Sequence, residues 1–126
     1  MPRLFSSADF KSECIKVKQY ADKHTPVVIC DDNALRGKPF KVKVKIGTSV
    51  KHPNALDHHY QYIQLWNLET LVGEIKLQRA SYGDDPVFIE VDFTIIPKVS
   101  MRLLALAYCN QHGLWRSEEV FVKVKD

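Results

Sequence analysis

Five side chains that can bind a metal ion are spread over three short segments of this chain: His24, His52, His58, Cys109 and His112. The chain has five histidines in all, and four of them belong to this set of five side chains. A soft thiolate together with borderline imidazoles suits iron, copper or zinc, and does not suit magnesium or calcium. The set favours a redox-active transition metal, and therefore electron chemistry.

Each segment taken alone is a weak signal, and the combination is what matters. Cys109 and His112 lie three residues apart, so a tight turn lets both reach one ion, but half of a zinc site has the same spacing. His52 and His58 are six residues apart in a stretch that can fold back on one centre. Five protein ligands exceed the four of a structural zinc site. A five-coordinate centre leaves one position open for a small substrate.

Alternating apolar and polar residues predict that most of the chain forms strands. Period-two patterns cover residues 40–46, 74–78, 87–93 and 120–124. Residues 60–68 and 101–108 are more continuously apolar and are typical of central strands, and residues 27–30 form a short candidate. Glycine- and proline-containing turns separate these runs. About seven strands joined by turns predict an all-β fold, an Ig-like antiparallel β-sandwich.

The candidate ligands must then be positioned by the ends of this sandwich. A short helix is expected over residues 8–21, with Phe10, Cys14 and Val17 on one side. Pro53 disfavours a helix at His52. All three ligand segments are therefore expected on loops or strand ends, where a rigid sandwich displays functional groups. His59 points to the opposite face from its neighbour if a strand begins nearby, so we expect it outside the ligand set.

Size and composition indicate a single domain over residues 1–126. The 18 Lys and Arg exceed the 15 Asp and Glu by three, a dispersed excess that argues against nucleic-acid binding and is compatible with a small anionic substrate. Three widely spaced cysteines do not form a disulfide framework, so we expect a cytoplasmic protein. The N-terminus lacks a signal-peptide pattern, and the apolar run over residues 103–109 is too short to span a membrane.

The three segments together resemble the superoxide reductase family, specifically its single-iron class, also called neelaredoxin. The family pattern runs Glu-Lys-His-x-Pro, then His-Pro-x-x-x-x-His, then Cys-x-x-His-Gly-Leu-Trp. This chain has Asp22-Lys23-His24-Thr25-Pro26, then His52-Pro53 with His58 at the end of the second motif, then Cys109 to Trp115. Three ordered motifs from about residue 22 to residue 115 make the resemblance specific.

The resemblance implies one mononuclear iron, with His24, His52, His58 and His112 as equatorial ligands and the Cys109 thiolate as the axial ligand. It implies that superoxide is reduced by one electron to hydrogen peroxide without formation of dioxygen. It implies a separate electron donor such as rubredoxin and a homotetramer, in which exposed strand 40–46 pairs between subunits. The N-terminal four-cysteine iron domain of two-iron relatives is not expected, since only Cys14 and Cys30 remain.

The resemblance also implies roles for two residues beside His24. Lys23 matches the family lysine, whose positive charge attracts the superoxide anion and helps to deliver a proton through water. Asp22 stands where the family usually has Glu, whose carboxylate can occupy the sixth iron position in the oxidised state. Asp is one methylene shorter, so we expect Asp22 to cap ferric iron poorly or not at all.

Two functions from other classes compete with this interpretation. A non-enzymatic β-sandwich with a structural zinc ion explains Cys109 and His112 but leaves His24 and one of the paired histidines unused. A cupredoxin-like electron carrier needs two histidines, one cysteine and a nearby axial methionine. No methionine follows Cys109, and Met101 lies upstream on a predicted strand.

Overall fold

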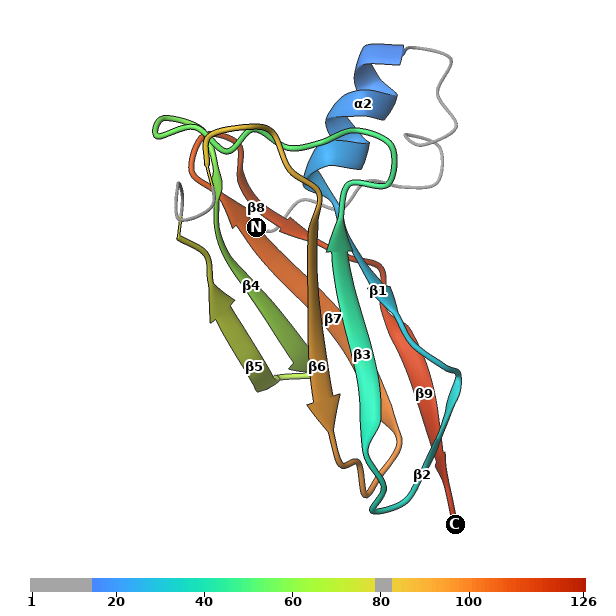
Figure 1. The fold of residues 1–126 in the computed structure, drawn as a ribbon. Helices are drawn as coiled ribbons and strands as arrows, with labels where there is room; N and C mark the ends of the chain where they lie inside the picture. The colour runs from blue at the N-terminus through green and yellow to red at the C-terminus, as the bar shows by residue number, and fades with distance from the viewer. Residues whose placement is uncertain (1–14, 79–82) are drawn as a thin grey trace.

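A computed structural model describes residues 15–78 and 83–126 (Figure 1). One helix precedes nine strands in this part of the chain. They are α2 (Ile15–His24), β1 (Pro26–Ile29), β2 (Asn33–Leu35), β3 (Phe40–Ile46), β4 (Tyr60–Asn67), β5 (Thr70–Lys76), β6 (Ile89–Ile95), β7 (Met101–Cys109), β8 (Gly113–Arg116) and β9 (Val120–Lys125).

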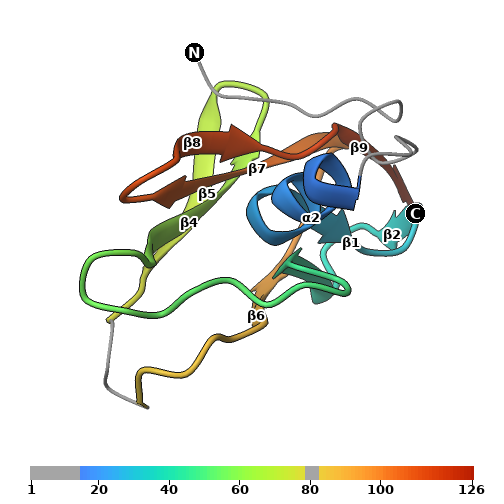
Figure 2. The same cartoon turned by 90° about the horizontal axis from the view of Figure 1, so that it is seen from above.

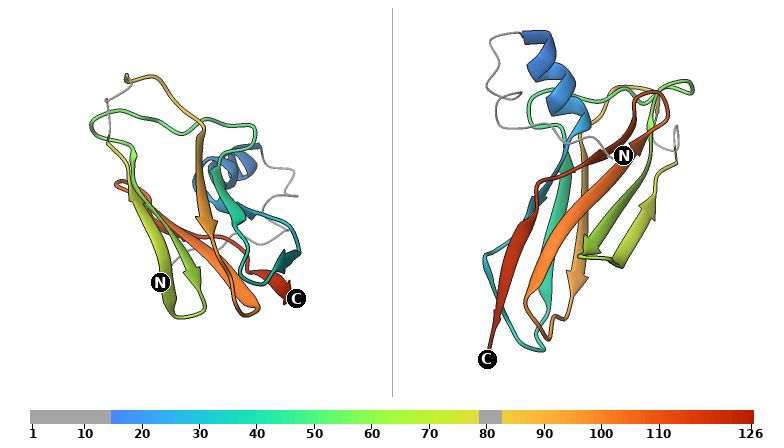
Figure 3. Two further views of the ribbon diagram at one scale, coloured as in Figure 1. Left: turned by 60° about the horizontal axis from the view of Figure 1, so that its bottom comes forward. Right: turned by 180° about the vertical axis from the view of Figure 1, so that it is seen from behind.

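The strands form two sheets that pack face to face as a sandwich (Figures 1 and 3). The smaller sheet has the order β1-β3-β6. The larger sheet has the order β2-β9-β7-β4-β5, with β8 also paired to β7. Only the β2–β9 pair is parallel among the described strands. The predicted all-β sandwich is confirmed, with two short strands, β2 and β8, beyond the seven expected.

The core follows from the period-two patterns. On β3, Val42, Val44 and Ile46 are fully buried while the intervening lysines point outward. On β7, Leu103 and Ala105 are fully buried on the face toward the smaller sheet. A buried aliphatic side chain stabilises the fold by about 1.5–3 kcal/mol relative to exposure, so this double layer fixes the register of both sheets.

The position of β3 inside the smaller sheet changes the expectation that this strand pairs between subunits. Strand 40–46 was expected to pair between subunits, but β3 pairs with β1 on one edge and with β6 on the other. β6 pairs with β3 along its whole length, and β1 pairs with it at residues 43–46. β3 is therefore an inner strand of the smaller sheet and not the exposed edge strand that was expected.

The helix is the second difference from the sequence prediction. It was expected over residues 8–21, and the structure has α2 at Ile15–His24; residues 8–14 lie outside the described ranges. The helix ends at His24, since Pro26 disfavours helical geometry at Thr25. His24 is therefore the last residue of a helix and not a loop residue. In the described ranges no helix has the length and apolar character required to cross a membrane.

Three segments that are far apart in sequence meet at one end of the sandwich. In Figures 1 and 2, α2 stands at the end where β3 and β7 finish, beside the long connection between β3 and β4 and the turn between β7 and β8. Each of these segments contains part of the predicted ligand set. The fold thus gathers the three sequence motifs at one end of a rigid scaffold.

Candidate metal centre

The five predicted ligands converge at this end of the sandwich. The potential donor atoms of His24, His52, His58 and Cys109 all lie within 4.8 Å of one another. His112 joins them, because its Nδ1 is 3.1 Å from Nε2 of His58 and 3.9 Å from Sγ of Cys109. One ion can therefore reach donors from three segments that span 89 positions of the chain, from 24 to 112 inclusive.

The backbone holds two imidazoles in a defined tautomer. Nδ1–H of His24 donates to the carbonyl of Tyr20 at 2.9 Å, one turn earlier in α2. Nδ1–H of His52 donates to the carbonyl of Pro53 at 2.7 Å. A carbonyl can only accept, so Nδ1 is the protonated nitrogen in each ring and Nε2 presents its lone pair to the centre. Such second contacts orient metal-binding histidines.

One of the donor atoms is buried without a hydrogen-bond partner, as expected for an atom that binds a metal ion. Nε2 of His24 is buried and has no hydrogen-bond partner, although buried polar atoms are nearly always paired. Sγ of Cys109 is fully buried 3.4 Å from Nε2 of His52. Four imidazoles and one thiolate are a soft and borderline set, which suits iron, copper or zinc. A cation at this point would satisfy the orphaned nitrogen of His24.

Burial sets the protonation of these groups. The pKa of His24 is lowered to about 4 and that of His52 to about 3, mainly by burial, and nearby positive groups, including Lys23, contribute to both shifts. Burial also raises the pKa of the Cys109 thiol, against the opposing effect of amide hydrogen bonds from His112 and Gln111. The imidazoles of His24 and His52 are thus neutral and ready to bind a cation at neutral pH, and a bound cation is what would hold Cys109 as a thiolate.

The turn after Cys109 shapes the sulfur's surroundings. Cys109 ends β7 and pairs with Gly113, the first residue of β8. Gly113 has a φ of +85°, a conformation that glycine adopts without steric cost. In the turn that ends at this glycine, the backbone amides of Gln111 and His112 point toward the sulfur of Cys109. Those amides stabilise negative charge on sulfur and so tune the centre.

Aromatic side chains wall the site, and two of them were not foreseen. Trp115, expected to pack beneath the centre, is fully buried and stacks on His24 with ring centroids 4.9 Å apart. Tyr60 lies 4.4 Å from His52 by ring centroids, and its hydroxyl donates to the carbonyl of His24. Tyr20 packs edge-on against His112 and Trp115. A tyrosine two residues after a ligand, at the start of a strand, was the available signal for Tyr60.

The remaining predicted residues take distinct positions. Lys23 is half-buried, and its charge acts on His24, His52 and His58. Asp22 is half-buried and faces the loop after β3, where its carboxylate accepts hydrogen bonds from the backbone amides of Thr48, Ser49 and Val50 and from the Thr48 hydroxyl.

His59 lies outside the donor cluster, as expected. Its Nδ1–H donates to the carbonyl of Ala55 at 3.0 Å, and its amide donates to the Asn110 side chain at 2.8 Å. Asn110 in turn donates its own backbone amide to the carbonyl of His59. His59 therefore ties the second motif to the turn after Cys109 without supplying a ligand.

Comparison with known proteins agrees with the geometry. The family model described as Desulfoferrodoxin matches residues 16–118, which include all five donors. The chain belongs to the desulfoferrodoxin family. It is 34% identical over 110 residues to the superoxide reductase of Pyrococcus furiosus, an alignment that covers 77% of this chain and 86% of that protein. It is 31% identical over 124 residues to the superoxide reductase of Thermococcus kodakarensis, covering 94% and 96%.

Solved structures of this family have the same fold. The superoxide reductase (neelaredoxin) of Ignicoccus hospitalis superposes with a TM-score of 0.69 at 28% identity, over 91% of this chain and 89% of that one. A structure of a Thermotoga maritima putative superoxide reductase has a TM-score of 0.76 at 22% identity, over 99% and 95%. The second match supports the fold alone, and the first supports fold and family together.

Proposed function

We propose that this chain is a superoxide reductase that binds one mononuclear iron through His24, His52, His58, His112 and Cys109. The observation that carries the proposal is the convergence of four imidazoles and one buried thiol on one point, in a chain of the desulfoferrodoxin family. In the reaction, superoxide takes up one electron and two protons and leaves as hydrogen peroxide. No dioxygen is formed.

The chain's residues provide the setting for this electron transfer. Iron, when bound, supplies the electron by cycling between Fe2+ and Fe3+. Cys109 would hold it as a thiolate, with amides of the following turn directed at the sulfur. Trp115 and Tyr60, both buried, exclude water from the inner side of the site. His58 and His112 are more exposed than His24 and His52, so substrate enters from their side.

Lys23 is proposed to attract the anion and to assist its protonation. Its charge is near enough to act on three of the histidines and on Cys109. Superoxide carries one negative charge, so a cation at the entrance raises its local concentration and its rate of encounter. Water hydrogen-bonded to the ammonium group can pass a proton to the reduced substrate.

Asp22 is proposed to act as an anchor and not as a sixth iron ligand. Its carboxylate accepts hydrogen bonds from three successive amides of the loop after β3. These bonds outweigh the effect of burial and lower the pKa of Asp22. A carboxylate held in this way connects the end of α2, which presents His24, to the connection that leads to His52. Ligating iron would require breaking this set of bonds.

The competing functions account for fewer observations. A structural zinc site needs four ligands, and a fifth donor lies at hydrogen-bonding distance from the cluster. A cupredoxin-like site needs an axial methionine near Cys109, but Met101 is at the other end of β7. The two residues are eight positions apart along the strand, which corresponds to about 26 Å.

Partners and location remain part of the proposal. We infer that electrons come from a separate small redox protein such as rubredoxin, that the chain assembles as a homotetramer and that it works in the cytoplasm. These inferences are based on the family resemblance and on the cysteine content. They can be checked by reduction with a purified rubredoxin and by the mass of the protein in solution.

The test of the function is metal content together with the visible spectrum and product analysis. Protein made in iron-replete cells should contain one iron per chain and turn blue on mild oxidation. When mixed with superoxide and a reductant, it should produce hydrogen peroxide without dioxygen. Stoichiometric zinc and a colourless protein would contradict the proposal, and so would dioxygen release in the ratio of a dismutation.

A further inference from the structure

His58 is held in place differently from the two buried histidines of the donor set. His24 and His52 each donate Nδ1–H to a backbone carbonyl, which fixes the orientation of the ring. Among the described residues, no hydrogen bond involves Nδ1 of His58, and its Nε2 lies 3.1 Å from Nδ1 of His112. Metal-binding histidines are commonly oriented by such a second contact. The position of the His58 imidazole therefore depends on the backbone on either side of it.

Hydrogen bonds from the turn between β7 and β8 hold that backbone on both sides of His58. The backbone amide of Asn110 donates to the carbonyl of His59 at 3.1 Å, and its side-chain oxygen accepts the amide of His59 at 2.8 Å. The side-chain nitrogen of Asn110 donates to the carbonyl of Asp57 at 3.1 Å, and the Gln111 side chain donates to the same carbonyl at 2.6 Å. An amide can only donate and a carbonyl can only accept, so both polar atoms of the Asn110 side chain are used.

Asn110 extends the pairing of β4 with β7 by one residue beyond the sheet. The last backbone pair at this end is Tyr60 with Cys109. At the next position, the backbone of Asn110 supplies the donor and its side chain supplies the acceptor for His59. In an antiparallel ladder, backbone groups make both of these contacts. The Asn110 side chain therefore continues the ladder as far as the residue next to His58.

The turn that holds the His58 segment also carries two other donors. Cys109 ends β7, and His112 lies in the turn before β8. Hydrogen bonds from this turn therefore fix His58 relative to a thiol and an imidazole that come from another part of the chain. His58 and His112 are also the more exposed histidines of the set, on the side where substrate is proposed to enter. Movement between the two segments would separate their donor atoms and weaken the hold on an ion.

We propose that Asn110 is a positioning residue of the metal centre, whose side chain sets where His58 lies relative to Cys109 and His112. The inference rests on the proposed metal site and adds a residue outside the donor set. The Asn110 side chain bonds to backbone atoms of Asp57 and His59, so it acts on an ion only through the donors. The motif Cys-x-x-His leaves this position unspecified, so the sequence pattern does not mark it.

Release of the bound metal tests this role in the protein as isolated. The metal is identified by elemental analysis, and its transfer to an excess of a chromophoric chelator is timed. Asn110→Ala should release the metal about tenfold faster than the wild type, because both side-chain bonds are lost. Asn110 is half-buried and its φ is not in the left-handed region, so its backbone accepts alanine. Asn110→Asp keeps the acceptor for His59 while Gln111 still holds Asp57, so its release should stay within about threefold of wild type.

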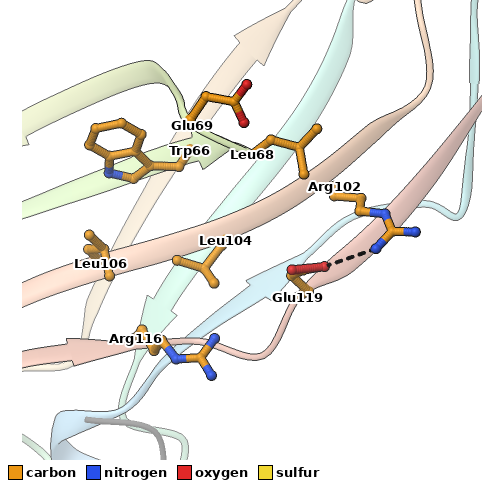
Figure 4. A pocket seen from close by; sticks show the side chains of 8 residues that line it. All are labelled: Trp66, Leu68, Glu69, Arg102, Leu104, Leu106, Arg116 and Glu119. Atoms are coloured by element: carbon orange, nitrogen blue, oxygen red, sulfur yellow. Dashed lines mark ion pairs between the residues drawn. The ribbon is translucent and has the colours of Figure 1, made fainter. Parts of the chain in front are cut away.

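Asn67→Ala is the matched control, at the other end of the same strand pair. The side-chain oxygen of Asn67 accepts the backbone amide of Arg102 at 3.0 Å, which is the same kind of bond. Figure 4 shows Arg102 at this end with Trp66 and Leu68, around an outward hollow of about 380 Å³ that none of the five donors lines. The urea midpoint of unfolding should fall in both alanine variants. Metal release from Asn67→Ala should stay within about twofold of wild type, because the site is distant.

The outcomes separate positioning from a general effect on stability. Release from Asn110→Ala at the wild-type rate would overturn the proposal. Equal acceleration in Asn67→Ala would also overturn it, because the effect would then come from the stability of the strand pair. Release from Asn110→Asp as fast as from Asn110→Ala would show that the bond to His59 does not carry the effect. Wild-type protein isolated with zinc would contradict the proposed function instead, and the release test would apply to zinc unchanged.

Discussion

At the scale of single residues, Cys109 is the donor whose chemistry depends most on a bound ion. Its side chain is fully buried, and burial raises the pKa of its thiol. Two amides directed at the sulfur favour the thiolate but do not offset burial. The polypeptide therefore prepares a site that is completed only when a cation binds, which is typical of thiolate-bound metals.

Removing this sulfur should remove both the colour and the reaction. In Cys109→Ala the thiolate-to-iron absorption is expected to disappear, and the rate of superoxide reduction should fall by more than about a hundredfold. The checks are the visible spectrum of the oxidised protein and a rapid-mixing assay. Cys30→Ala is the matched control, because Cys30 is a half-buried cysteine on the far side of β1 from α2 and outside the donor cluster. Activity retained in Cys109→Ala would remove the thiolate from the mechanism.

Lys23 should act through its charge. In Lys23→Ala the second-order rate with superoxide is expected to fall by about tenfold at low ionic strength, and the rate should depend less on salt. Pulse radiolysis at several salt concentrations measures both. Lys18→Ala removes an exposed charge from the same helix and should change the rate much less. Equal effects of the two substitutions would assign Lys23 to general surface charge.

At the scale of elements, the junction between α2 and the loop after β3 determines where His24 and His52 lie. Asp22 joins the two through amides of residues 48–50. The family pattern has Glu at this position, and a side chain one methylene longer would place its oxygens differently. The shorter side chain of this chain matches its use as an anchor.

Truncating the anchor should loosen the site without changing the iron coordination. Asp22→Ala leaves three loop amides without their acceptor, so the free energy of unfolding should fall by about 1–3 kcal/mol. The spectrum of the oxidised protein at neutral pH should stay unchanged, because the proposed role of Asp22 is that of an anchor and not of an iron ligand. Urea unfolding and absorption spectroscopy test the two halves. Ser49→Ala keeps every backbone donor and is the control. A shifted absorption band in Asp22→Ala alone would mean that the carboxylate ligates ferric iron.

The elements also show what sequence patterns can and cannot predict. Strands such as β3 and β7 were predictable because residues that follow one another in the chain alternate between buried and more exposed positions. β2 and β8 are three and four residues long, and each forms by pairing with a strand elsewhere in the fold. Their existence depends on tertiary context, which no local pattern encodes.

The same distinction holds within the site. The donors were predictable since their residue types and spacing are chemically unusual, and their convergence followed once the three motifs were considered together. The bonds of Asp22 to the loop after β3 were not predictable, because they depend on how α2 meets a loop 26 residues further along the chain. Tyr60 was missed for a related reason: its role comes from contact with the backbone of His24, not from its place in a motif.

At the scale of the whole molecule, the two buried histidines should make the metal-free protein sensitive to acid. Folding lowers the pKa of His24 to about 4 and of His52 to about 3, against 6.5 for the unfolded chain. The unfolded state therefore takes up protons first as the pH falls below 6.5. Stability is full above pH 6.5 and is lost toward pH 4, by up to about 1.4 kcal/mol per pH unit for each histidine.

Urea unfolding of metal-free protein at pH 7.5 and pH 5 measures this loss. The midpoint should be lower at pH 5 in the wild type. In the His24→Gln/His52→Gln double variant the difference between the two pH values should shrink, because neither side chain titrates. An equal loss of stability in the double variant would place the acid sensitivity in other groups.

Metal binding should join three separate segments of the molecule at one end of the sandwich. The donors come from the end of α2, the connection between β3 and β4 and the turn between β7 and β8, and the core strands support all three from one side. An ion that binds only the folded state stabilises it in proportion to the logarithm of its concentration over its dissociation constant. The bonds to the metal act where the three segments meet, so their effect on local opening should be concentrated there.

Hydrogen exchange of the iron-loaded and metal-free proteins tests this distribution. Removing the metal should speed exchange most at the amides of residues 54–59 and 110–112, which lie next to the donors and between strands. The amides of Val42 and Val44, in the centre of the smaller sheet, are the internal reference, and their local protection should be retained. A uniform increase across the sandwich would mean that the ion supports the whole fold. No change beside the donors would mean that the site is already rigid before the metal arrives.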